Sequence, residues 1–73
     1  MLTINMQATG NNIKNLRKLN NNRLQDLVDV CGVTPVAICK WQSGKTLPTI
    51  DNLVILASLW GVKIDDIIVT DTV

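Results

Sequence analysis

The sequence predicts one small all-α domain of five helices arranged around a central helix-turn-helix. Three observations lead to this. The chain has 73 residues, 47% of them hydrophobic. This is enough apolar sequence for one hydrophobic core, and the chain is too short for two. Apolar residues recur at helical spacing, and threonine, proline and glycine stand where helices begin and end. Two of the helical segments are separated only by Gly32-Val33-Thr34, which allows nothing but a tight turn.

A first helix is expected over about residues 11–19, where Ile13, Leu16 and Arg17 lie at i, i+3 and i+4. It should end in residues 20–22, because three consecutive asparagines favour a turn. A second helix is expected over about residues 24–31, where a stripe of apolar residues recurs at the same spacing.

The third helix should begin at Thr34-Pro35, a hydroxyl cap followed by a proline at the first helical position, and end near Ser43-Gly44. Gly32 supplies the positive φ that ends the helix before it.

A fourth helix should start after Thr49 and end at Gly61. Residues 64–69 are rich in β-branched residues, which favour a strand, but Asp65 and Asp66 in a first turn favour a short fifth helix.

This pattern divides the chain into a flexible N-terminal arm over residues 1–9, a helix-turn-helix domain over residues 10–69 and a C-terminal tail over residues 70–73. No apolar run approaches the ~18 residues of a membrane span, and no secretory signal is recognisable. We therefore expect a cytoplasmic protein with no membrane partner.

The composition argues against an enzyme. The chain has no histidine and all six of its acidic residues are aspartates, so the usual general base and the commonest metal ligand are missing. Cys31 and Cys39 are eight residues apart, without companion ligands for zinc, and are expected to be free thiols rather than a disulfide. We expect no catalytic site, no metal, no cofactor and no small-molecule ligand.

Charge is distributed unevenly along the chain. Residues 1–45 carry six lysines and arginines against two aspartates, a net charge of +4, whereas residues 46–73 carry one lysine against four aspartates, a net charge of −3. Such asymmetry indicates an anionic partner for the basic half, although two solvated faces without a binding role would give the same count.

The segment from Leu24 to Gly44 meets the requirements of a helix-turn-helix, with apolar residues where the helices cross, a glycine in the turn and apolar anchors on the second helix. An ordinary corner between two helices needs part of this pattern, but the joint spacing is more specific: Leu27, Val28, Gly32, Val33, Ile38, Trp41 and Gly44.

From about Ile13 to Val69, the chain resembles the lambda-repressor-like, Xre/Cro-type family of helix-turn-helix DNA-binding proteins. The resemblance rests on residues 13–17, 32–34 and 38–44, and on single positions such as Leu27, Pro48 and Leu53. It implies five helices with the third in the major groove of double-stranded DNA. It also implies a sequence-specific transcription regulator of bacterial or phage type, a repressor, acting as a homodimer.

Residue roles follow from the resemblance. With Ile38 facing inward and ~100° per residue, the outward face of the third helix is expected to read bases. Its base-reading candidates are Pro35, Val36, Ala37, Cys39 and Lys40. The expected phosphate contacts are Arg23, Gln25, Ser43, Lys45 and Thr46.

Two departures from the family pattern carry expectations of their own. Gln42 stands where relatives often have a glutamate paired with an arginine, so a neutral hydrogen bond to Arg17 is expected. The reading face offers one long polar side chain, that of Lys40, and would depend on methyl contacts, water and DNA shape. An alternative function is therefore a protein-interaction module on the same fold that has lost direct readout.

A dimer surface is expected on the last two helices, where apolar residues exceed the needs of a single core. The candidates are Ile55, Leu59, Ile64, Ile67 and Ile68. The alternative is that the fifth helix folds over its neighbour and satisfies these residues within the monomer.

Overall fold

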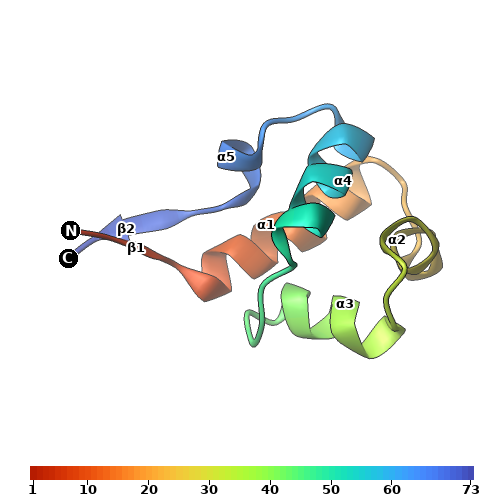
Figure 1. The fold of residues 1–73 in the computed structure, drawn as a ribbon, viewed down its shortest axis with the longest axis horizontal. Coiled ribbons are helices and arrows are strands. Elements are labelled where there is room, and N and C mark those ends of the chain that lie inside the picture. Colours follow the sequence, from red (N-terminus) through yellow and green to blue (C-terminus); the bar gives the residue numbers. More distant parts are fainter.

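The computed structural model describes all residues 1–73 and contains five helices and a short two-stranded sheet. The elements in chain order are β1 (Leu2–Ile4), α1 (Met6–Leu19), α2 (Leu24–Cys31), α3 (Pro35–Gln42), α4 (Ile50–Trp60), α5 (Ile64–Ile67) and β2 (Thr70–Thr72). The helices form one body, and the sheet extends from one end of it (Figure 1). No helix is long and apolar enough to cross a membrane.

The expected helix boundaries are confirmed wherever a capping residue predicted them. Thr34 and Thr49 each accept a hydrogen bond from a backbone N–H in the first turn of α3 and α4. Gly32 and Gly61 end α2 and α4 in the left-handed conformation, both with φ of 66°. The segment after Lys63 forms the short helix α5 rather than a strand.

The start of α1 differs from the expected one, since the helix begins at Met6 rather than near Asn11. Asn5 caps it by accepting a hydrogen bond from the Ala8 N–H at 2.9 Å. The early turns lack an apolar stripe because they pack through small residues. Thr9 and Gly10 are both buried there.

The expected flexible arm and tail also differ from the structure, because β1 and β2 pair with each other. The strands are antiparallel, with Leu2 opposite Thr72 and Ile4 opposite Thr70. All six residues of the two strands are exposed. The fold is therefore mostly helical rather than strictly all-α.

The core lies where the five helices meet. Its nine buried apolar residues come from every helix: Ile13, Leu27, Ile38, Trp41, Leu53, Leu56, Ala57, Trp60 and Ile67. Because Leu27 of α2 and Ile38 of α3 are both fully buried, the two helices of the helix-turn-helix are fixed to the body by their inner faces. Their outer faces remain free.

Candidate nucleic-acid interface

The outer face of α3 is the centre of the candidate interface. Two large residues, Ile38 at 0% exposure and Trp41 at 5%, hold the inner face of α3 in the core. The first turn is fixed by Thr34, whose Oγ1 accepts a hydrogen bond from the Ala37 N–H at 3.2 Å. With both constraints in place, α3 presents the opposite side chains to solvent as a rigid set.

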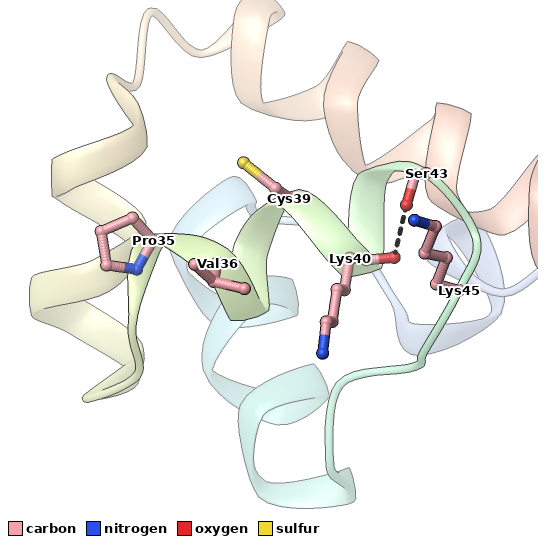
Figure 2. A pocket seen from close by; sticks show the side chains of 6 residues that line it. All are labelled: Pro35, Val36, Cys39, Lys40, Ser43 and Lys45. Atoms are coloured by element: carbon pink, nitrogen blue, oxygen red, sulfur yellow. Dashed lines mark hydrogen bonds between the residues drawn. The ribbon is translucent and has the colours of Figure 1, made fainter.

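The structure brings most of the expected base-reading residues together on this face. Pro35, Val36, Cys39 and Lys40 are exposed, and Val36 reaches 63% exposure, whereas Ala37 is half-buried. The four exposed residues, with Ser43 and Lys45, line a shallow hollow of about 480 Å³ (Figure 2). Cys39 and Lys40 leave the helix in different directions, so they border different parts of this surface (Figure 2).

The loop that follows α3 holds three of the expected phosphate contacts. The N–H groups of Lys45 and Thr46 both donate to the Lys40 carbonyl, at 3.0 and 3.4 Å, and the Ser43 hydroxyl donates to it at 3.2 Å. This winds the loop against the last turn of α3. Ser43, Lys45 and Thr46 are all exposed beside the outer face of α3.

The two phosphate candidates on the other side of α3 are engaged with acidic neighbours. The backbone N–H of Arg23 donates a hydrogen bond to Asp26 Oδ2 at 2.7 Å, and the side chain of Arg23 donates from Nη2 to Asp26 Oδ1 at 3.3 Å. These two hydrogen bonds hold the pKa of Asp26 below its usual value. Gln25 donates its Nε2 to Asp29 Oδ1 at 2.8 Å.

A phosphate that approaches the start of α2 would therefore meet a carboxylate as well as Arg23. Exposed ion pairs of this kind contribute little free energy and re-pair easily. Arg23 remains 82% exposed in its side chain, so it can turn from Asp26 to a phosphate without unfolding α2.

Two residues that the sequence did not single out extend the interface. Asn11 and Lys14 of α1 line a second shallow hollow of about 280 Å³ together with Cys39, Gln42 and Ser43. Their i, i+3 spacing on the side of α1 away from Ile13 was the available signal. Lys14 thereby adds a cation on the α1 side of the outer face of α3.

Close contact between α1 and α3 depends on Gly10. A Cβ atom at this position would lie 2.5 Å from the Trp41 carbonyl oxygen and 2.8 Å from that of Gln42. Only glycine allows the backbone of α1 to lie this close to the end of α3.

A chain of hydrogen bonds orients the helix-turn-helix on the body. Arg17 Nε donates to Gln42 Oε1 at 2.9 Å, which confirms the expected neutral hydrogen bond. Arg17 Nη1 also donates to the Asn22 carbonyl at 3.0 Å, and Asn22 Oδ1 accepts from Trp60 Nε1 at 2.7 Å. The turn before α2 and the end of α3 are thus tied to α1 and α4.

The expected dimer surface is only partly exposed. Ile67 is fully buried in the core of the monomer, and Ile64 and Ile68 are partly buried against it. For Ile67 this burial favours the alternative in which the fifth helix folds over its neighbour within the monomer, whereas a dimer role for Ile64 and Ile68 stays a prediction. Ile55 is half-buried and Leu59 is 40% exposed.

Ile55 and Leu59 instead belong to a shallow apolar groove between α2 and α4, here called the α2–α4 groove. It has a volume of about 420 Å³ and is lined by Val30, Val54, Ile55, Ser58 and Leu59.

Both cysteines are free thiols, as expected. Cys31 on α2 is half-buried, and this burial raises the pKa of its thiol. Cys39 is exposed on the outer face of α3. The two thiols therefore lie on different helices of the helix-turn-helix, one half-buried and one exposed.

Comparison with known proteins agrees with the helix-turn-helix fold. A family model described as helix-turn-helix matches residues 13–67. The crystal structure of the restriction-modification controller protein C.AhdI from Aeromonas hydrophila aligns with a TM-score of 0.74. That alignment covers 85% of this chain and 94% of that chain, with 14% sequence identity, and supports the shared fold. The comparison with curated protein sequences finds no match.

Proposed function

Because the chain belongs to the Xre/lambda-repressor-like helix-turn-helix family of DNA-binding transcription regulators, we propose that it binds specific double-stranded DNA sequences with α3 in the major groove. The observation that carries this proposal is the exposed outer face of α3, flanked by lysines on both sides. Lys14 lies on the α1 side, Lys40 on the helix itself and Lys45 in the loop that follows.

The chemistry of this face divides its tasks. Lys40 is suited to the guanine O6 and N7 acceptors, and Val36 and Pro35 are suited to thymine methyl groups. Lys14, Lys45, Ser43 and Thr46 are placed at the margins, where they would contact phosphates and fix the register of α3 on the duplex. Few polar groups then read bases, so DNA shape carries part of the specificity.

Regulation follows from occupation of the operator. We propose a cytoplasmic repressor of bacterial or phage type that binds as a homodimer to an operator with two half-sites. One copy presents a single short reading helix, and pairing of two copies supplies the affinity that one helix lacks.

The test is selection of bound duplexes from a random pool, followed by titration of the selected duplex and a scrambled duplex of equal composition. Specific recognition predicts a selected motif and a preference of at least about tenfold for it at physiological salt. If the selection enriches no motif and both duplexes bind with equal affinity, specific recognition is contradicted.

One observation favours a second candidate function. The hollow on α3 contains Val36 at 63% exposure beside Pro35, an apolar patch that a protein partner could cover. A protein-interaction module would show no duplex binding even at low salt. The titration above at low salt therefore separates the two functions.

A further inference from the structure

The ribbon formed by β1 and β2 has a free edge on each side. It extends from the helical body at the end away from the turn between α2 and α3 (Figure 1). All its residues are exposed, and two strands alone are marginally stable in water. Such an edge presents unpaired N–H and C=O groups that can pair with a further strand.

The hydrogen bonds at the two ends of the ribbon show which peptide groups are unpaired. The Asn5 N–H donates to the Val69 carbonyl and the Val73 N–H donates to the Met1 carbonyl, both at 2.8 Å. In an antiparallel ladder, residues that pair inward alternate with residues whose N–H and C=O groups point outward. The odd-numbered residues of β1 therefore pair with β2, and the even-numbered ones point outward.

Leu2 and Ile4 are these outward-pointing residues of β1. Their side chains lie on one face of the ribbon, at 67% and 42% exposure, opposite Thr72 and Thr70. The free edge of β1 thus combines unpaired peptide groups with two exposed apolar side chains.

Charge distinguishes the two edges of the ribbon. The middle residue of β2 is Asp71, whose Oδ2 accepts a hydrogen bond from Asn5 Nδ2 at 3.0 Å. The middle residue of β1 is the neutral Thr3. Two-fold pairing through β2 would place two aspartates opposite each other, which is unfavourable, whereas pairing through β1 places two threonines together.

We propose that β1 pairs antiparallel with β1 of a second copy of this chain, about a two-fold axis at Thr3. Leu2 then lies opposite the partner's Ile4, and each such pair exchanges two N–H···O=C hydrogen bonds. The four apolar side chains meet on one face of a four-stranded sheet. Because the strands run in opposite directions, the two helical bodies lie at opposite ends of this sheet.

This inference rests on the proposed function in one respect: the second copy is the partner that an operator with two half-sites requires. The α2–α4 groove is the competing surface for a second copy. Its shape does not select an occupant, whereas the edge of β1 is complementary to itself.

The test compares two proline variants at facing positions of the ribbon. Leu2→Pro removes an outward N–H of β1 and leaves the inner hydrogen bonds intact, while Thr72→Pro does the same on β2. Sedimentation equilibrium should show wild type and Thr72→Pro approaching twice the 8.0 kDa chain mass as concentration rises. Leu2→Pro should remain at the monomer mass over the same range, a loss of the dimer.

Three results would overturn the proposal. The first is a Leu2→Pro protein that dimerises like wild type. The second is loss of the dimer in both proline variants, because a two-fold pair of β1 strands does not use the edge of β2. The third is a Leu59→Gln variant, altered in the α2–α4 groove, that is monomeric while Leu2→Pro is dimeric.

A cysteine variant tests the register without relying on a proline. Across the two-fold axis, Thr3 faces its own copy in a non-hydrogen-bonded pair, whose Cα separation of about 4.5 Å permits a disulfide. In a Cys39→Ser background, Thr3→Cys should form an intermolecular disulfide on mild oxidation, and Asp71→Cys should not. Equal cross-linking of both variants would contradict the pairing through β1.

These experiments separate the pairing from the proposed function. A protein that dimerises through β1 but binds no duplex would contradict the DNA-binding proposal alone. A protein that binds duplex as a monomer, with no dimer on or off DNA, would contradict the pairing and the proposed homodimer and leave DNA binding through α3 standing.

Discussion

Lys40 and Lys45 are five positions apart in the sequence, yet their places in the structure assign them different tasks. Lys40 projects from the last turn of α3 on its outer face, and Lys45 follows the end of the helix (Figure 2). Lys40→Ala should weaken binding of the selected duplex by about 1–3 kcal/mol and relax its preference at one base position. Lys45→Ala should weaken all duplexes alike, as measured by fluorescence anisotropy.

Lys63 supplies the matched control for both lysines, because it is the exposed N-cap residue of α5. In Figure 1, α5 lies on the side of the body away from α3. Lys63→Ala should bind like wild type. Equal losses from all three substitutions would indicate a non-specific charge effect and contradict the assigned positions.

Two glycines should respond to alanine for different reasons. Gly32 has φ of +66° and open space around it, so Gly32→Ala adds backbone strain alone, about 1–2 kcal/mol. Gly10→Ala would raise helix propensity, but its Cβ meets backbone atoms of α3 that cannot move independently. We expect a net loss of about 1–3 kcal/mol, a fall in melting temperature by thermal unfolding.

Gly61→Ala is the control for Gly32→Ala, since Gly61 has the same φ and the same open surroundings outside the helix-turn-helix. If Gly10→Ala raised the melting temperature, as alanine does at an ordinary helical position, the close packing of α1 on α3 would be refuted.

The acidic cap of α2 makes the stability of this helix depend on pH. Asp26 accepts hydrogen bonds from the Arg23 backbone N–H and, more weakly, its side chain, and both lower the pKa of Asp26 from 3.8. A lowered pKa in the folded state means that the carboxylate stabilises the fold above its ordinary pKa. This contribution is lost as pH falls through the lowered value.

Asp26→Asn should therefore reduce the melting temperature at neutral pH, and the difference from wild type should shrink as pH falls below about 4. Thermal unfolding followed by circular dichroism across that range measures it. Asp29→Asn is the exposed neighbouring control on α2. A difference that grew on acidification would contradict the assigned role of Asp26.

The two thiols provide a footprint of the bound duplex on α3. Alkylation of the free protein should modify the exposed Cys39 faster than Cys31, whose raised pKa keeps it as the unreactive thiol. The selected duplex should slow modification of Cys39 by about tenfold or more and leave Cys31 unchanged, as resolved by peptide mass mapping. Full reactivity of Cys39 in a saturated complex would place α3 outside the interface.

At the scale of elements, local sequence signals predicted the helices. They did not predict the features that depend on contacts between residues far apart in the sequence. Thr34-Pro35 and Gly32 placed the ends of α2 and α3 because caps act within one turn. The early start of α1 depends on Thr9, which exchanges hydrogen bonds with Val69 sixty positions away. The pairing of β1 with β2 likewise joins the two ends of the chain and has no local pattern.

The candidate site was predictable to the same degree. The outward set on α3 follows from helix periodicity once Ile38 is placed in the core. The pairing of Arg23 with Asp26 and of Gln25 with Asp29 depends on side-chain choices at the surface, for which the sequence offers several partners. The position of Lys14 beside α3 could not be predicted from the sequence, because it depends on how α1 packs against α3.

The whole molecule separates charge in space as the chain separates it in sequence. The lysines of the interface lie on α1, α3 and the loop after α3, whereas Asp65, Asp66 and Asp71 lie on α5 and β2. In Figure 1, α5 lies on the opposite side of the body from α3. A net charge of only +1 is therefore compatible with a locally basic surface that orients the protein on an anionic duplex.

The most direct test of this account is the salt dependence of duplex affinity. If Lys14, Lys40 and Lys45 neutralise phosphates or base edges as assigned, the logarithm of the association constant should fall with the logarithm of salt concentration with a slope of about −2 to −3 per monomer. Lys45→Ala should reduce the magnitude of this slope by about one, and Lys63→Ala should leave it unchanged. Absence of duplex binding at the lowest salt, or a slope that no interface lysine alters, would contradict DNA binding through α3.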